Sequence, residues 1–152
     1  MRTSAGTSQK IRVRTAQITD AGRIAAFAEQ LGYPCSSASI RRRLRNLLAS
    51  NDNAVWVAEI DGGAVVGWVH VFVKQVLESE REAEIGGLVV DKAFRGQGVG
   101  RVLVQRAEQW ARTKRLKSVY LRSNIIRKEA HLFYEKLGLK IIKTQYAFRK
   151  PI

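Results

Sequence analysis

Apolar and polar residues alternate along the chain with two periods, one typical of strands and one typical of helices. In the N-terminal part, the alternation over residues 11–18 predicts a strand. Apolar residues spaced three and four apart then predict helices over residues 21–31 and 39–49, with Ser36 or Ser37 placed to cap the second helix. The chain is therefore expected to begin with a strand and two amphipathic helices.

A hairpin is the clearest feature of the middle of the chain. Strands are predicted over residues 54–60 and 64–76, because Asp61-Gly62-Gly63 between them is a strong turn signal. Both faces of the second strand are largely apolar, which is typical of a central strand covered on both sides. The apolar run 85–90 predicts the next strand. In the acidic segment before it, Glu78 and Glu80 are expected to lie in an exposed hairpin loop, unless the segment is extended, and Glu84 abuts the strand.

The C-terminal third predicts two more helices separated by a short strand. The helices are expected over residues 101–114 and 127–137, and the strand over residues 117–121. Alternation over residues 139–142 and 145–148 predicts a final strand or hairpin. Strands and helices thus follow one another along the whole chain, as in an α/β (α+β) protein.

Length and composition favour one globular domain. Of the 152 residues, 45% are hydrophobic and 26% are charged, which is ordinary for such a domain. Residues 1–10 are polar and without periodicity, so we expect a disordered tail before a single domain over residues 11–152. No apolar run reaches the ~18 residues of a membrane span. Residues 1–10 also lack the apolar core of a secretory signal, and a lone Cys35 fits a reducing compartment. We therefore expect a cytoplasmic protein without a membrane partner.

The net charge of +14 is the most unusual property of the composition. A basic surface can attract nucleic acid, anionic lipid or a polyanionic cofactor, or it can simply favour solubility. The chain lacks the aromatic and basic motifs of the known RNA-binding modules, so nucleic acid is not favoured as a partner.

A glycine-rich segment, Asp91 to Gly100, separates the strand 85–90 from the helix predicted after it. Backbone N–H groups at a helix N-terminus lack partners within the helix, and the helix dipole adds partial positive charge, so such a turn can bind phosphate. The pattern Arg95-x-x-Gly98-x-Gly100 is not a P-loop, because the Lys-Ser/Thr ending is missing. It is not the dinucleotide fingerprint either, because its glycines come two apart. Taken alone, the segment could also be a turn that binds nothing.

Two blocks of sequence together support a ligand-binding role. The chain resembles the GNAT superfamily of acyl-CoA-dependent N-acyltransferases, whose pyrophosphate-binding signature is Arg/Gln-x-x-Gly-x-Gly/Ala after a strand that ends much like residues 88–91. A second block, Asn124 followed by residues 130–139, is similar to the family's second cofactor-contacting segment. The blocks lie in the family's order and at a similar spacing, and the resemblance covers about residues 11–148.

The resemblance implies a fold and a cofactor. The fold would be a mixed, mostly antiparallel sheet of about six to seven strands, with helices on both faces and a splayed strand pair that holds the cofactor. Acetyl-CoA would be the cosubstrate, and no metal is expected, because the sequence has no cluster at metal-ligand spacing. Gly86-Gly87 would allow the bulge that opens this strand pair. The residues expected to contact the cofactor are Leu88, Val89, Val90, Arg95, Gly96, Gln97, Gly98, Val99, Gly100, Arg101, Asn124 and Phe133.

Transfer of an acyl group from a thioester to an amine needs a base for the amine, a donor for the oxyanion and an acid for the thiolate. Glu84 is the favoured base, directly or through water, because it abuts a buried strand, where a carboxylate takes up a proton more readily. Glu82 and Glu59 are alternatives. The resemblance implies a backbone N–H near Leu88 as the donor and Tyr134 as the acid, although Tyr134 could instead be a half-buried packing residue.

These observations predict an N-acetyltransferase that moves an acetyl group from acetyl-CoA to a primary amine by direct attack. The acceptor would be a small-molecule amine or a protein amino group, and a homodimer is compatible with the sequence. The alternative is a catalytically silent acyl-CoA-binding module on a basic protein that docks on nucleic acid or the ribosome. The presence of Tyr134 and Glu84 argues against this alternative, because a module without catalysis would not require them.

Overall fold

The computed structural model describes residues 10–152, which form two units, one ending at Leu121 and one running over residues 122–152. Each unit is described here by itself. The single domain expected over residues 11–152 therefore stays a prediction. The tail expected over residues 1–10 lies, apart from Lys10, outside the described residues.

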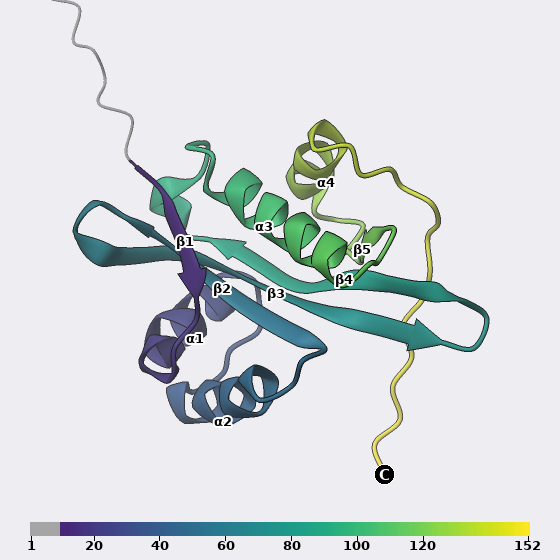
Figure 1. Ribbon diagram of the computed structural model, residues 1–152, viewed down its shortest axis with the longest axis horizontal. Coiled ribbons are helices and arrows are strands. Elements are labelled where there is room, and N and C mark those ends of the chain that lie inside the picture. The colour runs from purple at the N-terminus through teal and green to yellow at the C-terminus, as the bar shows by residue number, and fades with distance from the viewer. Residues whose placement is uncertain (1–9) are drawn as a thin grey trace, which may run out of the picture. The chain divides into compact units, whose positions relative to one another are not determined.

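A sheet of five strands in the order β1-β2-β3-β4-β5 forms the centre of the first unit (Figure 1). Its first three neighbouring pairs are antiparallel, and β4 and β5 are parallel. A mixed, mostly antiparallel sheet was predicted, and it is confirmed. The strands are β1 (Arg12–Thr15), β2 (Asn53–Ile60), β3 (Ala64–Val76), β4 (Ser79–Val90) and β5 (Val119–Leu121).

The number of strands is smaller than the six to seven predicted, because residues 139–142 and 145–148 form no strand. Their alternating pattern is real, but a strand also needs a neighbour for its backbone hydrogen bonds. Within residues 10–152 no such neighbour pairs with them.

Apart from Glu78, which lies in the β3–β4 turn as expected, the acidic segment before residue 85 belongs to a strand. Strand β4 begins at Ser79, so the prediction of a strand confined to residues 85–90 was too short. Strand β3 is 13 residues long, and pairs such as Lys74 with Glu82 extend the ladder into the acidic segment. Cross-strand pairing therefore overrides the polar composition of this segment.

The turn between β2 and β3 confirms the predicted hairpin. A short 3₁₀ turn, η2 (Asp61–Gly63), joins the two strands. Gly62 and Gly63 have φ angles of 83° and 81°, a region that residues with a Cβ rarely adopt.

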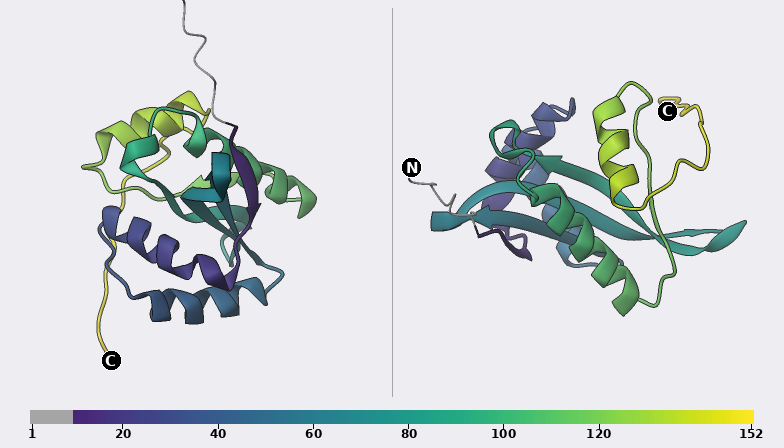
Figure 2. Two further views of the ribbon diagram at one scale, coloured as in Figure 1. Left: turned by 90° about the vertical axis from the view of Figure 1, so that its left-hand side faces the viewer. Right: turned by 90° about the horizontal axis from the view of Figure 1, so that it is seen from above.

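Helices cover both faces of the sheet within the first unit, as predicted (Figures 1 and 2). On one face lie α1 (Ala21–Gln30) and α2 (Ser37–Leu48), the second of which begins where the Ser36 hydroxyl accepts a bond from the Ser39 N–H (3.1 Å). The core on this face is made by Ile24, Phe27, Leu44, Val55 and Val57. On the other face lies α3 (Val99–Thr113), whose buried side chains include Leu103, Val104 and Ala107.

The second unit contains α4 (Lys128–Lys136), which is followed by a chain without regular secondary structure. Gly138 has a φ of 93°, which confirms its predicted place just after the end of this helix. Within residues 10–152, no helix combines the length and the apolar character needed to cross a bilayer.

An ionic cluster ties β1 to β2 and to the turn before α1. The Arg14 guanidinium donates two hydrogen bonds to Asp20, of 2.8 and 2.9 Å, and a further one to Glu59. The Gln17 backbone N–H also donates to Asp20 (2.7 Å). Burial of Asp20 by itself disfavours its charged form, but the bonds from Arg14 and Gln17 outweigh this effect and lower the pKa of the carboxyl.

We predict that Asp20→Asn lowers the free energy of unfolding by about 2 kcal/mol at pH 7, because Arg14 then loses its buried anionic partner. A carboxyl whose pKa is lowered by folding stabilises the protein above its unfolded pKa of about 4, and this contribution is lost as the pH falls through the folded value. The difference between variant and wild type should therefore shrink in acid. Urea unfolding at pH 7 and at acid pH measures both effects. Asp52→Asn, at an exposed carboxylate, is the control and should change little; an equal loss in the two variants would contradict the role of the cluster.

Candidate functional site

A bulge in β4 is the geometric origin of the site. His70 of β3 pairs with Gly87, and Val71 pairs with Ile85, so Gly86 is an extra residue on β4. A Cβ on Gly87 would lie 2.7 Å from the Trp68 ring, and one on Gly86 would lie 3.1 Å from both His70 Nδ1 and the Phe72 ring. The two glycines thus let β4 pass close over three large side chains, as their presence in the sequence suggested.

Beyond the bulge, β4 continues without β5 as a neighbour, because β5 ends at Leu121. Strand β5 pairs with β4 only at Ala83, Glu84 and Ile85. Further along β4, the Asp91 N–H donates to Val66 O (2.8 Å), so backbone groups of the same parity as Asp91 point toward β3. Those of Leu88 and Val90 therefore point to the opposite side, where the first unit offers no strand. This unpaired side of β4 is compatible with the splayed strand pair that the resemblance implies, which stays a prediction.

The end of β4 leads directly into the glycine-rich turn. After Asp91 the chain makes the short 3₁₀ turn η3 (Lys92–Phe94) and reaches α3 through Gly96 and Gly98, with φ angles of 78° and 87°. Gly98 is the N-cap residue of α3 and has no side chain with which to cap the first turn. The N-terminus of a 15-residue helix thus has backbone N–H groups available beside three exposed residues, which are Gly96, Gln97 and Arg101.

Arg95 braces this turn. Its Nε donates to Val90 O (3.3 Å), the last residue of β4. The bond uses one of the five N–H donors of the guanidinium. Bracing and a contact with an anionic ligand, which the sequence left as alternatives, are therefore compatible in one side chain.

The three candidate bases have different surroundings. Glu59 is bound to Arg14 in the ionic cluster, and Glu82 is bound to Lys74 Nζ (3.1 Å) and to the Ser118 hydroxyl (3.0 Å). Glu84 is only 6% exposed and lies opposite Phe72 on one side and Tyr120 on the other. It shares a face with Trp68, which packs against the core under α1 and α2.

Lys74 adds a positive charge to the same region. Its Nζ lies 4.0 Å from the centre of the Tyr120 ring. The hydrogen bond with Glu82 is the main cause of a raised Lys74 pKa, and the charges of Glu82, Tyr120 and Glu84 act in the same direction. The face next to the bulge therefore combines two carboxylates with one ammonium.

His70 lies on this face as well, and the sequence favoured a packed or hydrogen-bonded histidine here over a base. Its Nε2 forms a hydrogen bond with Asn53 Oδ1 (2.9 Å), its ring lies against Phe72, and burial lowers its pKa. His70 is thus a packed, hydrogen-bonded histidine. Its Nδ1 nevertheless lies beside the bulge at Gly86. The alternation of β3, considered together with the Gly86-Gly87 pair, is the sequence signal that could have placed it there.

The other predicted site residues, Asn124, Phe133 and Tyr134, lie in the second unit. Asn124 orders the chain before α4, because its Oδ1 accepts from the Ile126 N–H (3.1 Å) and its carbonyl accepts from the Arg127 N–H (3.0 Å). The rings of Phe133 and Tyr134 are 5.3 Å apart. Burial raises the pKa of Tyr134, against a smaller opposing effect of the Arg127 charge, so the phenol holds its proton at neutral pH.

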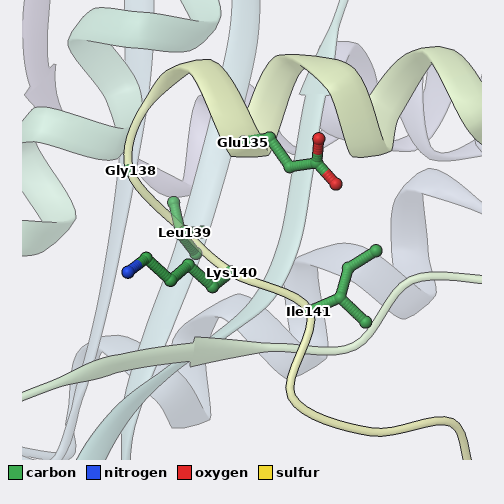
Figure 3. Close-up of a pocket in the computed structure, with 5 residues that line it drawn as sticks. All are labelled: Glu135, Gly138, Leu139, Lys140 and Ile141. Carbon is green, nitrogen blue, oxygen red and sulfur yellow. The ribbon is translucent and has the colours of Figure 1, made fainter.

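A shallow hollow lies just after α4 in the second unit (Figure 3). It is lined by Glu135, Gly138, Leu139, Lys140 and Ile141, and none of these is a predicted site residue. Over residues 10–152, no group of three or more His, Cys, Asp or Glu side chains is arranged to hold a metal ion.

Comparison with known proteins gives the site its context. A model of the acetyltransferase (GNAT) family matches residues 22–139. The N-acetyltransferase YhdJ of Bacillus subtilis (strain 168) is 42% identical over 69 residues, which are 45% of this chain and 47% of that protein. The N-acetylaspartate synthetase of Danio rerio is 32% identical over 96 residues, 63% of this chain and 33% of that protein. The chain thus matches about half the length, or less, of these relatives.

Solved structures share the fold across nearly the whole chain. An aminoglycoside 6'-N-acetyltransferase from Acinetobacter baumannii has a TM-score of 0.82 at 16% identity, over 94% of this chain and 99% of that one. An aminoglycoside N-acetyltransferase in complex with CoA has a TM-score of 0.84 at 16% identity, over 97% of this chain and 99% of that one. At this level of identity the likeness shows the fold alone.

Proposed function

The chain belongs to the acetyltransferase (GNAT) family, and on this premise we propose that it moves an acetyl group from acetyl-CoA to a primary amine. The observation that carries the proposal is the continuity of two features on β4. The strand continues past Ile85, where its neighbour β5 ends, and it leads into the glycine turn that begins α3. A ligand with an amide-bearing arm and a pyrophosphate fits these two features in that order.

The first unit supplies the seat for acetyl-CoA. The outward backbone groups of Leu88 and Val90 would pair with the amides of the pantetheine arm, as a neighbouring strand would. The pyrophosphate would lie at the start of α3, where residues 95–101 present backbone N–H groups and two arginines. Val89 and Val99 are buried and keep strand and helix in place, while Gly100 allows close approach at the first turn.

The chemistry would be a direct attack of the amine on the thioester. The amine nitrogen forms a bond to the acetyl carbon, the carbon–sulfur bond breaks, and the sulfur leaves as the thiolate. Glu84 would take the proton from the amine, directly or through water, and the Leu88 N–H would stabilise the oxyanion. Tyr134, whose phenol is protonated at neutral pH, would give its proton to the thiolate. Asn124 and Phe133 would steady the cofactor beside it.

The acceptor would approach the face of the sheet that carries Glu82 and Glu84. Carboxylates there would attract an ammonium group at short range. The net charge of +14 would repel polycations, an effect that salt screens over a length of about 8 Å at physiological ionic strength. A small-molecule amine with few charges, or a single amino group of a protein, suits both conditions.

Gly98→Asp should abolish acetyl-CoA binding, because the added carboxylate places bulk and negative charge where the pyrophosphate would lie. The measurement is thermal unfolding with and without acetyl-CoA, since a ligand at 100 times its Kd stabilises the wild type by about 2.7 kcal/mol. Gly62→Asp is the matched control, because Gly62 also has a positive φ and open space at its Cβ, but lies in the β2–β3 turn. Retained binding in Gly98→Asp would show that the turn is not the phosphate site.

Tyr134→Phe should lower kcat by roughly 10²-fold while leaving acetyl-CoA affinity nearly unchanged, because it removes a proton donor and keeps the ring. Release of free thiol across a panel of amines measures turnover, and thermal unfolding measures binding. Tyr33→Phe, at a residue that is 70% exposed, is the control. If Tyr134→Phe lost acetyl-CoA binding and kept its turnover, this would contradict the role of Tyr134 as the acid. Cofactor binding without thiol release in the wild type would favour a silent module.

Glu84→Gln should lower kcat/KM by roughly 10²–10⁴-fold at pH 7, because the ammonium form of the acceptor then has no base to receive its proton. The loss should shrink at alkaline pH, where more of the amine is already neutral. Glu80→Gln, at an exposed position on the same strand, serves as the control. A pH–rate profile equal to that of the wild type would exclude Glu84 as the base.

A further inference from the structure

Asn53 determines which nitrogen of the His70 ring carries the proton. The Asn53 Nδ2 donates to the Ser50 hydroxyl oxygen (3.2 Å), so its Oδ1 is the atom that faces the ring. This Oδ1 is an acceptor without a proton, and it lies 2.9 Å from His70 Nε2. The bond therefore needs a proton on Nε2. In the neutral ring, Nδ1 then has a free lone pair.

His70 Nδ1 lies next to the bulge of β4. A Cβ on Gly86 would be 3.1 Å from this nitrogen and 3.1 Å from the Phe72 ring, so the missing side chain leaves room beside both. Gly86 is exposed, whereas His70 is half-buried. Within residues 10–152, Nδ1 has no hydrogen-bond partner. Its lone pair is thus open to a donor from outside the chain.

The His70 ring is neutral at pH 7. Burial lowers its pKa from the ordinary value of 6.5. Glu84 and the pair of Lys74 with Glu82 lie on the same face, and β2 presents the uncharged Asn53 to the ring. A neutral imidazole accepts a hydrogen bond from an amine without repelling its charge.

Glu84 and His70 can reach one atom placed between them. Glu84 pairs with Phe72, and His70 precedes Phe72 by two residues on β3, so Glu84 and His70 are diagonal neighbours on one face. Such neighbours are about 7–8 Å apart, a distance that long side chains span. A nitrogen in the space beside Gly86 would therefore have a carboxylate on one side and an imidazole on the other.

An acceptor that arrives as an ammonium ion loses two protons on its way to an amide. The first leaves before the attack, because an ammonium nitrogen has no lone pair. The second leaves after the nitrogen–carbon bond has formed, because the nitrogen is then positively charged again. While Glu84 holds the first proton it cannot take the second, so a further acceptor beside the same nitrogen favours the reaction.

We propose that His70 Nδ1 is this further acceptor: it accepts a hydrogen bond from the attacking nitrogen and takes its second proton once the nitrogen–carbon bond has formed. The inference rests on the proposed function. Glu84 takes the first proton, the carbon–sulfur bond breaks, and Tyr134 gives a proton to the thiolate. Of the two protons on Glu84 and His70, one returns to Tyr134 and the other goes to solvent. Asn53 Oδ1 stabilises the charged ring through Nε2.

Two substitutions separate this role from packing. His70→Gln places its amide near the position of Nε2 and keeps the bond to Asn53, whereas His70→Asn places its oxygen near the position of Nδ1. Neither amide takes up a proton, so kcat should fall by about 10²-fold in both variants. The KM for the amine should rise several-fold in His70→Gln alone, because His70→Asn keeps an acceptor for the amine.

These kinetics use the amine of the panel that gives the fastest thiol release with the wild type. Acetyl-CoA should stabilise both variants against thermal unfolding as it does the wild type. A His70→Gln variant with the kcat of the wild type would overturn the inference and leave the acetyltransferase in place, because the bond to Asn53 would then be the whole role of His70. A wild type that neither binds acetyl-CoA nor releases thiol would overturn the proposed function and this inference together.

Nitrogen NMR of the ¹⁵N-labelled full chain tests the proton assignment without turnover, even if the variants fail to fold. The chain has two histidines, so the spectrum of His131→Gln identifies the resonances of His70. At neutral pH we expect a proton on Nε2 and none on Nδ1. With CoA and the same amine present, the Nδ1 resonance should shift and the Nε2 resonance should change little. A proton on Nδ1, or an Nδ1 resonance that the amine leaves unchanged, would overturn the inference.

Discussion

The extra residue in β4 is the constraint on which the rest of the site depends. Before the bulge, the Ala83 N–H donates to Ser118 O (3.0 Å), so the backbone N–H and C=O groups of the odd-numbered residues point toward β5. After Gly86, the hydrogen bond from the Asp91 N–H to Val66 O means that the backbone groups of the odd-numbered residues point toward β3. Those of Leu88 and Val90 point away from β3, to the side without a strand. One inserted residue thus divides β4 into a part that pairs with strands on both sides and a part whose backbone pairs with β3 alone. The absence of a Cβ at Gly86 and Gly87 makes this possible over Trp68, His70 and Phe72.

Several of the few carboxylates in this basic protein have defined structural partners. The chain has a net charge of +14 and only 13 carboxylate side chains. Asp20 and Glu59 share Arg14 and hold the first strand, whereas Glu82 holds Lys74 and Ser118 across three strands. These pairs fix the sheet on both sides of the face that carries Glu84. Glu59 and Glu82 are thus engaged in structural bonds, and Glu84 as the base stays a prediction.

Features set by local backbone chemistry could be predicted from the sequence. The β2–β3 turn and the glycine after α4 follow from the ability of glycine to adopt a positive φ, and β3 was predicted with its observed bounds. Features set by pairing could not. The start of β4 at Ser79 depends on the length of β3, and the absence of strands over residues 139–148 depends on the lack of a neighbour. In the site, the glycine turn was visible in the sequence, but the place of His70 beside Gly86 depends on a register that only the bulge creates.

The backbone groups of β4 that point away from β3 determine which positions of such a site tolerate substitution. A ligand held by the N–H and C=O groups of Leu88 and Val90 would meet atoms that every residue except proline possesses. The side chains at these positions are therefore free to drift among apolar types, as long as the strand keeps its shape and its bulge. Gly86, Gly87 and Gly98 have no such freedom, because a Cβ would meet a ring or force an unfavourable φ. In this part of the chain, the sequence requirement would therefore fall on the glycines. The backbone atoms that would bind the ligand impose no requirement on the residue type that carries them.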